Sequence, residues 1–323
     1  MAKITMREAI SQALWEEMER DERVFLLGEE IGVWGGTYAV TKGFYDHFGE
    51  KRVKDTPIAE SVIIGAALGA AMTGLRPVAE MMTINFAFAA FDHIVNQSAK
   101  MHAMFGGQMT APLVIRAPGG GGRQLGATHS QTPDAIFAHF PGLVVVAPGT
   151  PEDAKGLLKA AIRSNDPVLF IEHATMYQVR GEVPEGEFTI PIGKSNVQRP
   201  GKHVTVVTYS RGLDLSLKAA DVLAKEGIEI EIVDLRSLRP LDMGPVIESF
   251  KKTNRAVIVE EGWYSYGVGS EIQSRIYEQA FDYVDAPIKR VAQKEIPLPY
   301  NRRLEQLALP QVEDVVKAVK EVL

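Results

Sequence analysis

The chain has 323 residues, a net charge of −6 and no cysteine. This length predicts two domains. The mild negative charge and the absence of a basic block argue against a nucleic-acid partner. The lack of cysteine excludes disulfides, thiolate metal sites and cysteine nucleophiles, and it suits a reducing compartment.

Residues 1–21 have the pattern of an amphipathic helix, with Thr5 placed to cap it. They contain no apolar stretch of the signal-peptide kind. The uncharged run from Ser61 to Leu75 is short for a membrane span and rich in Gly and Ala. We therefore expect a buried helix there, no membrane partner and a cytoplasmic location, with a mature organellar protein as the alternative.

Short apolar strands alternate with helix patterns in the first half of the chain. Such strands are typical of a parallel sheet that helices cover on both faces. We expect strands at 24–29, 76–81, 112–117, 143–148 and 167–172, and helices at 6–20, 59–73, 87–104 and 151–163.

Residues 181–202 interrupt this alternation with proline, glycine and mixed charge. The predicted organisation is a first domain at 1–185, a linker at 186–202 and a second domain at 203–323. We expect an α/β fold with two doubly wound domains. In the second domain the predicted strands are 203–209, 228–235, 255–261 and 288–292, and the helices are 213–226, 242–252 and 268–281.

Several familiar catalytic motifs fail on spacing. The run Gly119–Gly122 has Gln124 where a dinucleotide-binding loop needs glycine, and GKS at 193–195 has Phe188 where a P-loop needs glycine. No serine lies in a nucleophile elbow. The seven histidines form no zinc-like pair.

Glu60 opens the uncharged run. In one interpretation it is an acid near a helix N-terminus, with Thr56 as N-cap and Pro57 at the first helical position. The capping-box position, however, is Ala59. In the other, Glu60 lies in line with Ile64 and Leu68, where a carboxylate needs a partner or holds its proton. The residues alone leave both open.

Two further side chains are candidates. His129 follows a glycine-rich loop and precedes a turn, so it is either an acid–base group or a surface histidine bonded to its own turn. Phe86 belongs to an aromatic group with residues 88 and 91, a pattern more typical of a core than of a site.

Motifs in both halves of the chain resemble beta subunits of thiamine-diphosphate-dependent 2-oxo acid dehydrogenases, most closely those that act on pyruvate. The runs are DTPIAE, GLRPVAE, NFAFAAFDHIVNQSAK, HSQTPDAIFAHFPGLVVVAP, DAKGLLKAAIRSNDPVLFIEH and VEEGWYSYGVGSEI. The resemblance covers essentially the whole chain. It implies a transketolase-like pyrimidine-binding domain followed by a transketolase C-terminal-like domain.

The resemblance also implies partners. An alpha subunit would hold magnesium and the cofactor's diphosphate through a GDG-type motif, and Gly-Asp occurs nowhere in this chain. The implied enzyme is an alpha2beta2 heterotetramer that shares thiamine diphosphate between chains and passes an acyl group to a lipoyl acyltransferase. The loop LGATHSQ favours pyruvate as substrate, with acetoin and branched-chain 2-oxo acids as alternatives.

Residue roles follow from the same resemblance. Glu60 would hydrogen-bond the aminopyrimidine ring, Phe86 would stack on it and Ile58 would line its pocket. His129 would donate a proton or stabilise charge during acyl transfer. A structural potassium ion would bind at Leu113, Ala161, Ile162, Ser164 and Asp166, although AAIRSND here replaces the more usual AAIRDNN-like run. The alternative there is an ordinary helix C-terminus.

A non-catalytic docking scaffold is the second hypothesis for the whole chain. Its acidic face would comprise Glu260, Glu261, Glu271 and Glu278. A transketolase-type carboligase is disfavoured because the diphosphate-binding half is missing. The smooth helix surface around Gly65 and Gly69 further predicts that this helix packs at a subunit interface.

Overall fold

The structure, a computed structural model, describes residues 1–323 and divides into two compact units. Unit 1 comprises residues 1–119 and 136–192, and unit 2 comprises residues 120–135 and 193–323. The glycine-rich segment that carries His129 therefore belongs to unit 2, although it lies in the first half of the sequence. The predicted α/β class with two doubly wound domains is confirmed.

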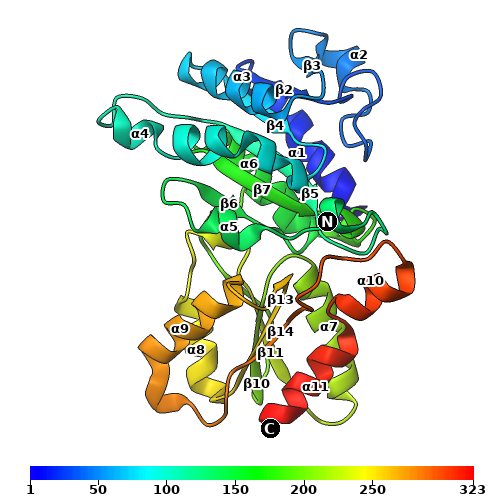
Figure 1. The fold of residues 1–323 in the computed structure, drawn as a ribbon, viewed down its shortest axis with the longest axis vertical. Coiled ribbons are helices and arrows are strands. Elements are labelled where there is room, and N and C mark those ends of the chain that lie inside the picture. The colour runs from blue at the N-terminus through cyan, green and yellow to red at the C-terminus, as the bar shows by residue number, and fades with distance from the viewer. The chain divides into compact units, whose positions relative to one another are not determined.

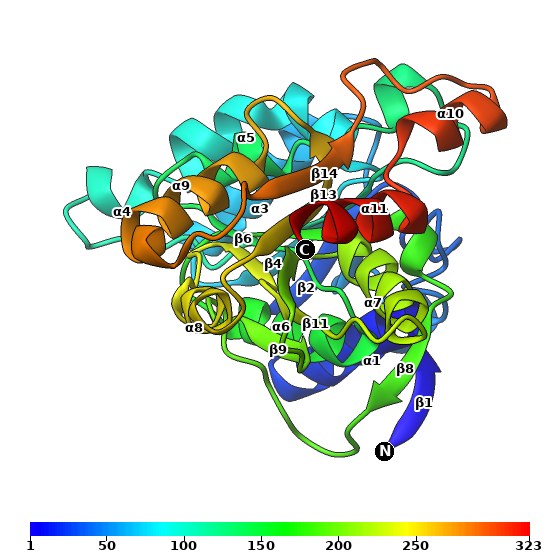
Figure 2. The ribbon, with the colours of Figure 1, turned by 90° about the horizontal axis from the view of Figure 1, so that it is seen from below.

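Unit 1 is built on a parallel sheet in the order β6-β7-β5-β4-β2-β3. A separate antiparallel pair joins β1 to β8 (Figure 2). Its strands are β1 (Ala2–Thr5), β2 (Val24–Gly28), β3 (Val53–Asp55), β4 (Arg76–Glu80), β5 (Val114–Gly119), β6 (Val144–Val146), β7 (Val168–His173) and β8 (Arg180–Val183). Its α-helices are α1 (Met6–Arg20), α2 (Phe44–Phe48), α3 (Glu60–Met72), α4 (Met101–Met104) and α6 (Pro151–Arg163), and α5 (Asp134–Ala138) begins in unit 2 and ends in unit 1.

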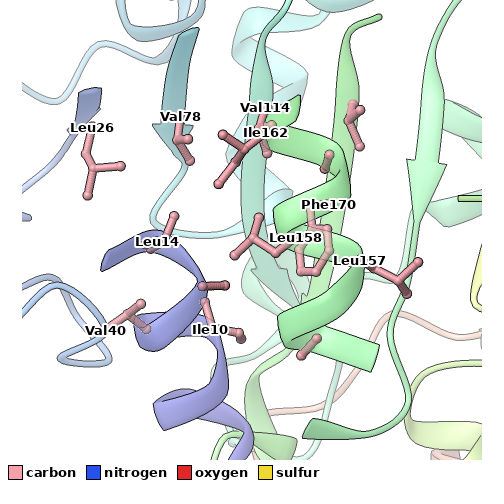
Figure 3. Close-up of a cluster of buried hydrophobic side chains, with 14 of the residues drawn as sticks. Ile10, Leu14, Leu26, Val40, Val78, Val114, Leu157, Leu158, Ile162 and Phe170 are labelled. Atoms are coloured by element: carbon pink, nitrogen blue, oxygen red, sulfur yellow. The ribbon is translucent and has the colours of Figure 1, made fainter. Parts of the chain in front are cut away.

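Helices α1 and α6 lie side by side on one face of this sheet (Figure 3). Ile10 and Leu14 of α1 and Leu158 of α6 are fully buried in the same cluster as strand residues Val78 and Val114. The predicted cap of α1 is confirmed, because the Thr5 side chain accepts from the Glu8 N–H and the Glu8 side chain accepts from the Thr5 N–H.

Unit 2 is a smaller doubly wound unit, with α8 and α9 on one side of its sheet and α7 and α11 on the other (Figure 1). The sheet order is β14-β13-β10-β11-β9, with β9 antiparallel to β11. The strands are β9 (Asn196–Arg199), β10 (Val204–Thr208), β11 (Ile230–Asp234), β12 (Ser237–Arg239), β13 (Ala256–Trp263) and β14 (Lys289–Gln293). The α-helices are α7 (Arg211–Ala224), α8 (Gly244–Thr253), α9 (Val268–Ala280), α10 (Arg302–Ala308) and α11 (Val312–Val322).

Two local expectations need correction. Thr56 is not an N-cap, because its N–H extends the strand pairing to the Gly28 carbonyl and the following Pro57 disfavours a helical conformation at Thr56. Helix α3 begins only at Glu60. The helix predicted at 87–104 is instead a 3₁₀ helix, η1 (Ile84–Ala90), a π-helix, η2 (His93–Ser98), and the short α4.

The centre of the unit 1 sheet holds a buried ion network. Arg116 donates to both oxygens of Glu172 at 2.6 and 2.8 Å and to Glu80 at 2.5 Å. Burial opposes the charge of Arg116, but the two carboxylates outweigh it and hold the pKa of the guanidinium above its usual value. Tyr177 also donates to Glu172.

We predict that Arg116→Met lowers the free energy of unfolding by about 3–5 kcal/mol, because it leaves two carboxylates buried without their cation. Urea unfolding followed by circular dichroism measures this loss. Arg275→Met, which removes a half-exposed ion pair with Glu271, is the matched control and should cost less than about 1 kcal/mol. Equal losses in the two variants would contradict the importance of the buried network.

Candidate active site

Three loops of unit 1 meet at one edge of its sheet. Gly28 of β2 pairs in register with Asp55 of β3 and with Glu80 of β4, and all three strands are parallel. The chain that leaves these strands carries Glu29, then residues 56–60, then residues 81–86. Ligands in open α/β sheets bind at the carboxyl ends of strands, so the topology gathers these segments where a site is expected.

Glu60 is the first residue of α3 and is half-buried. Ile64 and Leu68 below it are buried, as the apolar row predicted. The positive end of the helix dipole favours a negative charge at this position. Glu60 therefore combines two features that the sequence presented as alternatives. It lies at a helix N-terminus, and it is in line with the buried side chains of Ile64 and Leu68 on the same helix.

Glu29 is a candidate functional residue that the sequence reasoning missed. Its side chain is only 5% exposed, and its Oε1 atom is buried without a hydrogen-bond partner. Burial, followed by the nearby charges of Glu60 and Glu30, raises the pKa of Glu29 above its ordinary value. The signal was available, because LGEE places an acid directly after an apolar strand.

Phe86 and Ile58 add apolar surface to the same segments. Phe86 is half-buried in η1, and the neighbouring Phe88 stacks on Phe137. The Ser61 hydroxyl donates to the Ala89 carbonyl at 2.6 Å, which ties the start of α3 to the helix that carries Phe86. Ile58 is 79% exposed, an unusual position for a large apolar side chain.

These residues fit an aminopyrimidine ring. A half-buried carboxylate at Glu60 can share a proton with a ring nitrogen, and the unpartnered Oε1 of Glu29 adds hydrogen-bonding capacity beside it. An aromatic and an aliphatic side chain suit the flat faces of such a ring. No group of three or more His, Cys, Asp or Glu side chains is placed to hold a metal ion.

His129 lies in unit 2, whereas Glu60, Phe86 and Ile58 lie in unit 1. It ends the short 3₁₀ helix η3 (Ala127–His129) and is exposed. The ring Nδ1 atom lies 2.9 Å from the Thr128 hydroxyl oxygen, and the backbone N–H of His129 donates to the Gly126 carbonyl at 3.3 Å. An exposed imidazole on a loop can exchange a proton with a ligand or with water.

The acidic docking face predicted in unit 2 is wrong for two of its members. Glu260 and Glu261 of β13 are 1% and 7% exposed, because their side chains bind backbone N–H groups inside the unit. Burial raises the pKa of Glu260 to about 7. Burial and then the charge of Glu261 raise the pKa of Asp134 to about 7, next to the hydroxyl of Tyr209.

Two of the five predicted potassium positions, Ile162 and Ser164, face an internal cation. Arg76 Nη1 donates to the carbonyls of Ile162 and Ser164 at 2.9 and 2.8 Å. The carbonyl of Ala161 accepts from the Ser164 N–H, and that of Leu113 accepts from the Val168 N–H. A potassium ion would have to share oxygens with a guanidinium, which repels it. The residues present thus fit the protein's own cation better than a free ion.

Comparisons with known proteins match the whole chain. Residues 2–179 match the family described as transketolase, pyrimidine binding domain, and residues 193–315 match the transketolase C-terminal domain. A pyruvate dehydrogenase E1 component subunit beta of Rickettsia felis is 51% identical over 99% of this chain and 98% of its own. The mitochondrial subunit of Bos taurus is 48% identical over 99% of this chain and 91% of its own.

A solved structure shares the architecture. It is described as a split gene transketolase, inactive beta4 tetramer, and it superposes with a TM-score of 0.82 at 26% identity. The alignment covers 100% of this chain and 99% of that one. No helix of the present chain is both long and apolar enough to cross a membrane.

We predict that Asp134→Asn stabilises the protein more at pH 8 than at pH 5. Asp134 keeps its proton in the folded state up to about pH 7, whereas the unfolded chain releases it near 3.8. The loss of stability that Asp134 causes in the unsubstituted protein is absent below the pKa of the unfolded chain. It grows as the pH rises and is complete above the pKa of the folded state. At ~1.4 kcal/mol per pKa unit, the gain at pH 8 should be about 1–4 kcal/mol.

Thermal unfolding at the two pH values measures the gain. Asn has nearly the shape of Asp and carries no titratable group, so the substitution removes the titration with little change of shape. A gain of the same size at both pH values would show that Asp134 does not titrate in this range.

Proposed function

We propose that this chain, which belongs to the family of pyruvate dehydrogenase E1 beta subunits, supplies the pyrimidine-binding half of a thiamine diphosphate site. The expected reaction is oxidative decarboxylation of pyruvate with transfer of the acetyl group to a lipoyl acyltransferase. The observation that carries the proposal is the pair of acids Glu29 and Glu60 at the carboxyl ends of β2 and β3. Burial, and then the charge of Glu60, raises the pKa of Glu29.

Thiamine diphosphate, when bound, supplies the carbanion chemistry that decarboxylation of a 2-oxo acid requires. Glu60 would hydrogen-bond the aminopyrimidine ring of the cofactor and would exchange a proton with its ring nitrogen. Burial, followed by the charge of Glu60, raises the pKa of Glu29, which favours the neutral form of this carboxyl. Phe86 would stack on the ring, and Ile58 would line its pocket.

His129 acts later in the proposed reaction. Its exposed imidazole donates a proton, or stabilises charge, as the acyl group passes to the lipoyl arm. The Thr128 hydroxyl beside Nδ1 favours one orientation of the ring.

An alpha subunit completes the site in this proposal. The chain contains no Gly-Asp pair and no cluster of acids placed to hold magnesium, so magnesium and the diphosphate are assigned to the partner. An alpha2beta2 heterotetramer in the cytoplasm is the expected assembly. Potassium binding at 113, 161, 162, 164 and 166 stays a prediction, and no step depends on it.

Acetoin or a branched-chain 2-oxo acid remains the alternative substrate, because the missing alpha chain lines much of the pocket. A docking scaffold without catalysis is the alternative of another class. The burial of Glu260 and Glu261 weakens that alternative, since half of its proposed acidic face is inside unit 2.

We predict that the chain reduces an artificial electron acceptor in the presence of pyruvate, thiamine diphosphate and magnesium only when it is co-expressed with a GDG-bearing alpha chain. Glu60→Gln in that complex should lower kcat at least about 100-fold, since proton exchange with the ring is lost. Native mass spectrometry should show the same tetramer for both forms.

Glu50→Gln, at an exposed position of unit 1, is the matched control and should retain full activity. Full activity in Glu60→Gln would refute the assigned role. A stable complex with no activity towards pyruvate, but with activity towards acetoin or a branched-chain acid, would move the substrate to the alternative.

We also predict that Gly69→Leu weakens assembly. Val62, Ala66 and Gly69 are exposed on α3, and a Cβ atom at Gly69 meets nothing within 4 Å, so leucine fits the isolated chain. Loss of tetramer in native mass spectra, with an unchanged unfolding temperature of the isolated chain, is the expected result. Gln279→Leu on α9 is the control, and an intact Gly69→Leu tetramer would place the interface elsewhere.

A further inference from the structure

The glycine-rich segment that follows β5 is held by carboxylates of its own unit. Glu305 of α10 is fully buried, and its Oε1 atom accepts from the N–H groups of Gly122 and Gln124 at 3.0 and 3.1 Å. Its Oε2 atom also accepts from Gln124 at 3.1 Å. Gly122 and Gln124 have φ angles of +93° and +57°, which turn their N–H groups towards one oxygen. Successive N–H groups arranged in this way form an anion-binding nest.

A second carboxylate ties together the two ends of the loop. Glu261 Oε1 accepts from the Gly121 N–H at 2.7 Å and from the Thr132 hydroxyl at 3.3 Å. Its other oxygen accepts from Arg211 at 2.6 Å, so the charge of Glu261 is compensated within unit 2. The residues between these anchors include His129.

The backbone at Gly121 also lies against an apolar surface. A Cβ atom there would come within 2.7 Å of Leu298 and 2.8 Å of Leu309, so a larger residue would have to displace these side chains. Leu298 and Leu309 form a small buried cluster with Ala308 of α10. Helix α10 thus supplies both Glu305 and, through Ala308, part of the apolar cluster beside Gly121.

We propose that Glu305 and Glu261 are positioning residues that hold the loop of residues 120–132 and thereby place His129 for acyl transfer. The nest that resembled a nucleotide-binding loop in sequence binds an internal carboxylate instead of a phosphate. Neither acid contacts the reacting groups in this assignment; each acts through the backbone of the loop. The catalytic part of the inference depends on the function proposed above, whereas the anchoring of the loop does not.

Hydrogen exchange of the full chain in its complex with an alpha subunit tests the anchoring. Glu305→Met keeps the length of the side chain and removes both acceptors, so the amides of residues 121–125 should exchange at least about tenfold faster. Glu305→Gln keeps one acceptor oxygen without the charge and should show about two- to fivefold faster exchange. Glu313→Gln, at an exposed position of α11, is the matched control and should not change exchange.

Kinetics of the two half-reactions test the placement of His129. In Glu305→Met, acetylation of a free lipoyl domain should slow at least about tenfold, because His129 loses its position. Pyruvate-dependent reduction of an artificial acceptor, which does not need acyl transfer, should stay within about threefold of the unsubstituted enzyme. General destabilisation would instead raise exchange throughout unit 2 and slow both reactions alike.

The outcomes separate the two proposals. Unchanged exchange at 121–125 in Glu305→Met overturns the anchoring, whatever the enzyme does. Faster exchange with unchanged lipoyl acetylation overturns the placement of His129. Absence of pyruvate-dependent activity in the unsubstituted complex refutes the proposed function but leaves the exchange result valid. If Glu305→Met does not fold, Glu305→Gln carries the test, and exchange equal to that of the unsubstituted protein overturns the anchoring.

Discussion

The constraint on which both units depend is the cost of burying carboxylates. A charged carboxyl inside a protein must find a cation, find hydrogen-bond donors or keep its proton. This chain uses all three solutions. Arg116 compensates Glu80 and Glu172 in unit 1, backbone N–H groups bind Glu305 in unit 2, and Glu29, Asp134 and Glu260 have raised pKa values.

The way in which a buried carboxyl is compensated distinguishes the structural acids from the acids of the candidate site. Glu80 and Glu172 are held by short bonds to one guanidinium, so their oxygens are engaged within the protein. Glu29 has no such partner, and the charge that most affects it is that of Glu60. A buried acid without a partner beside a half-exposed one is unfavourable for stability alone, so the arrangement indicates a ligand that completes it.

The sequence predicted the regular elements because periodicity reports burial. Helices at 6–20 and 151–163 agree with α1 and α6 to the residue, since each has a cap and an amphipathic pattern. The segment 84–104 could not be resolved into 3₁₀, π and α turns, because these share nearly the same apolar spacing. Helices α10 and α11 were not predicted.

The site was predictable only in part, for a related reason. Glu60 stood out because it opens a long uncharged run, whereas Glu29 lies in the charged pair Glu29–Glu30, a pattern typical of solvated surface. Only the pairing of β2 with β3 brings Glu29 beside the segment of Glu60. The assignment of residues 120–135 to unit 2 depends likewise on contacts across more than a hundred residues.

These contacts explain why a glycine-rich run can resemble a phosphate-binding loop in sequence and yet bind a carboxylate of the same chain. Glycine permits the left-handed backbone that turns successive N–H groups towards one anion, but it does not specify which anion. In a nucleotide-binding loop the anion arrives with the ligand. Here Glu305 supplies it from the same unit, so the turn is complete before any ligand binds. In the proposed reaction, a loop formed in this way would spend less binding free energy on ordering, which would leave more to orient the acyl acceptor near His129.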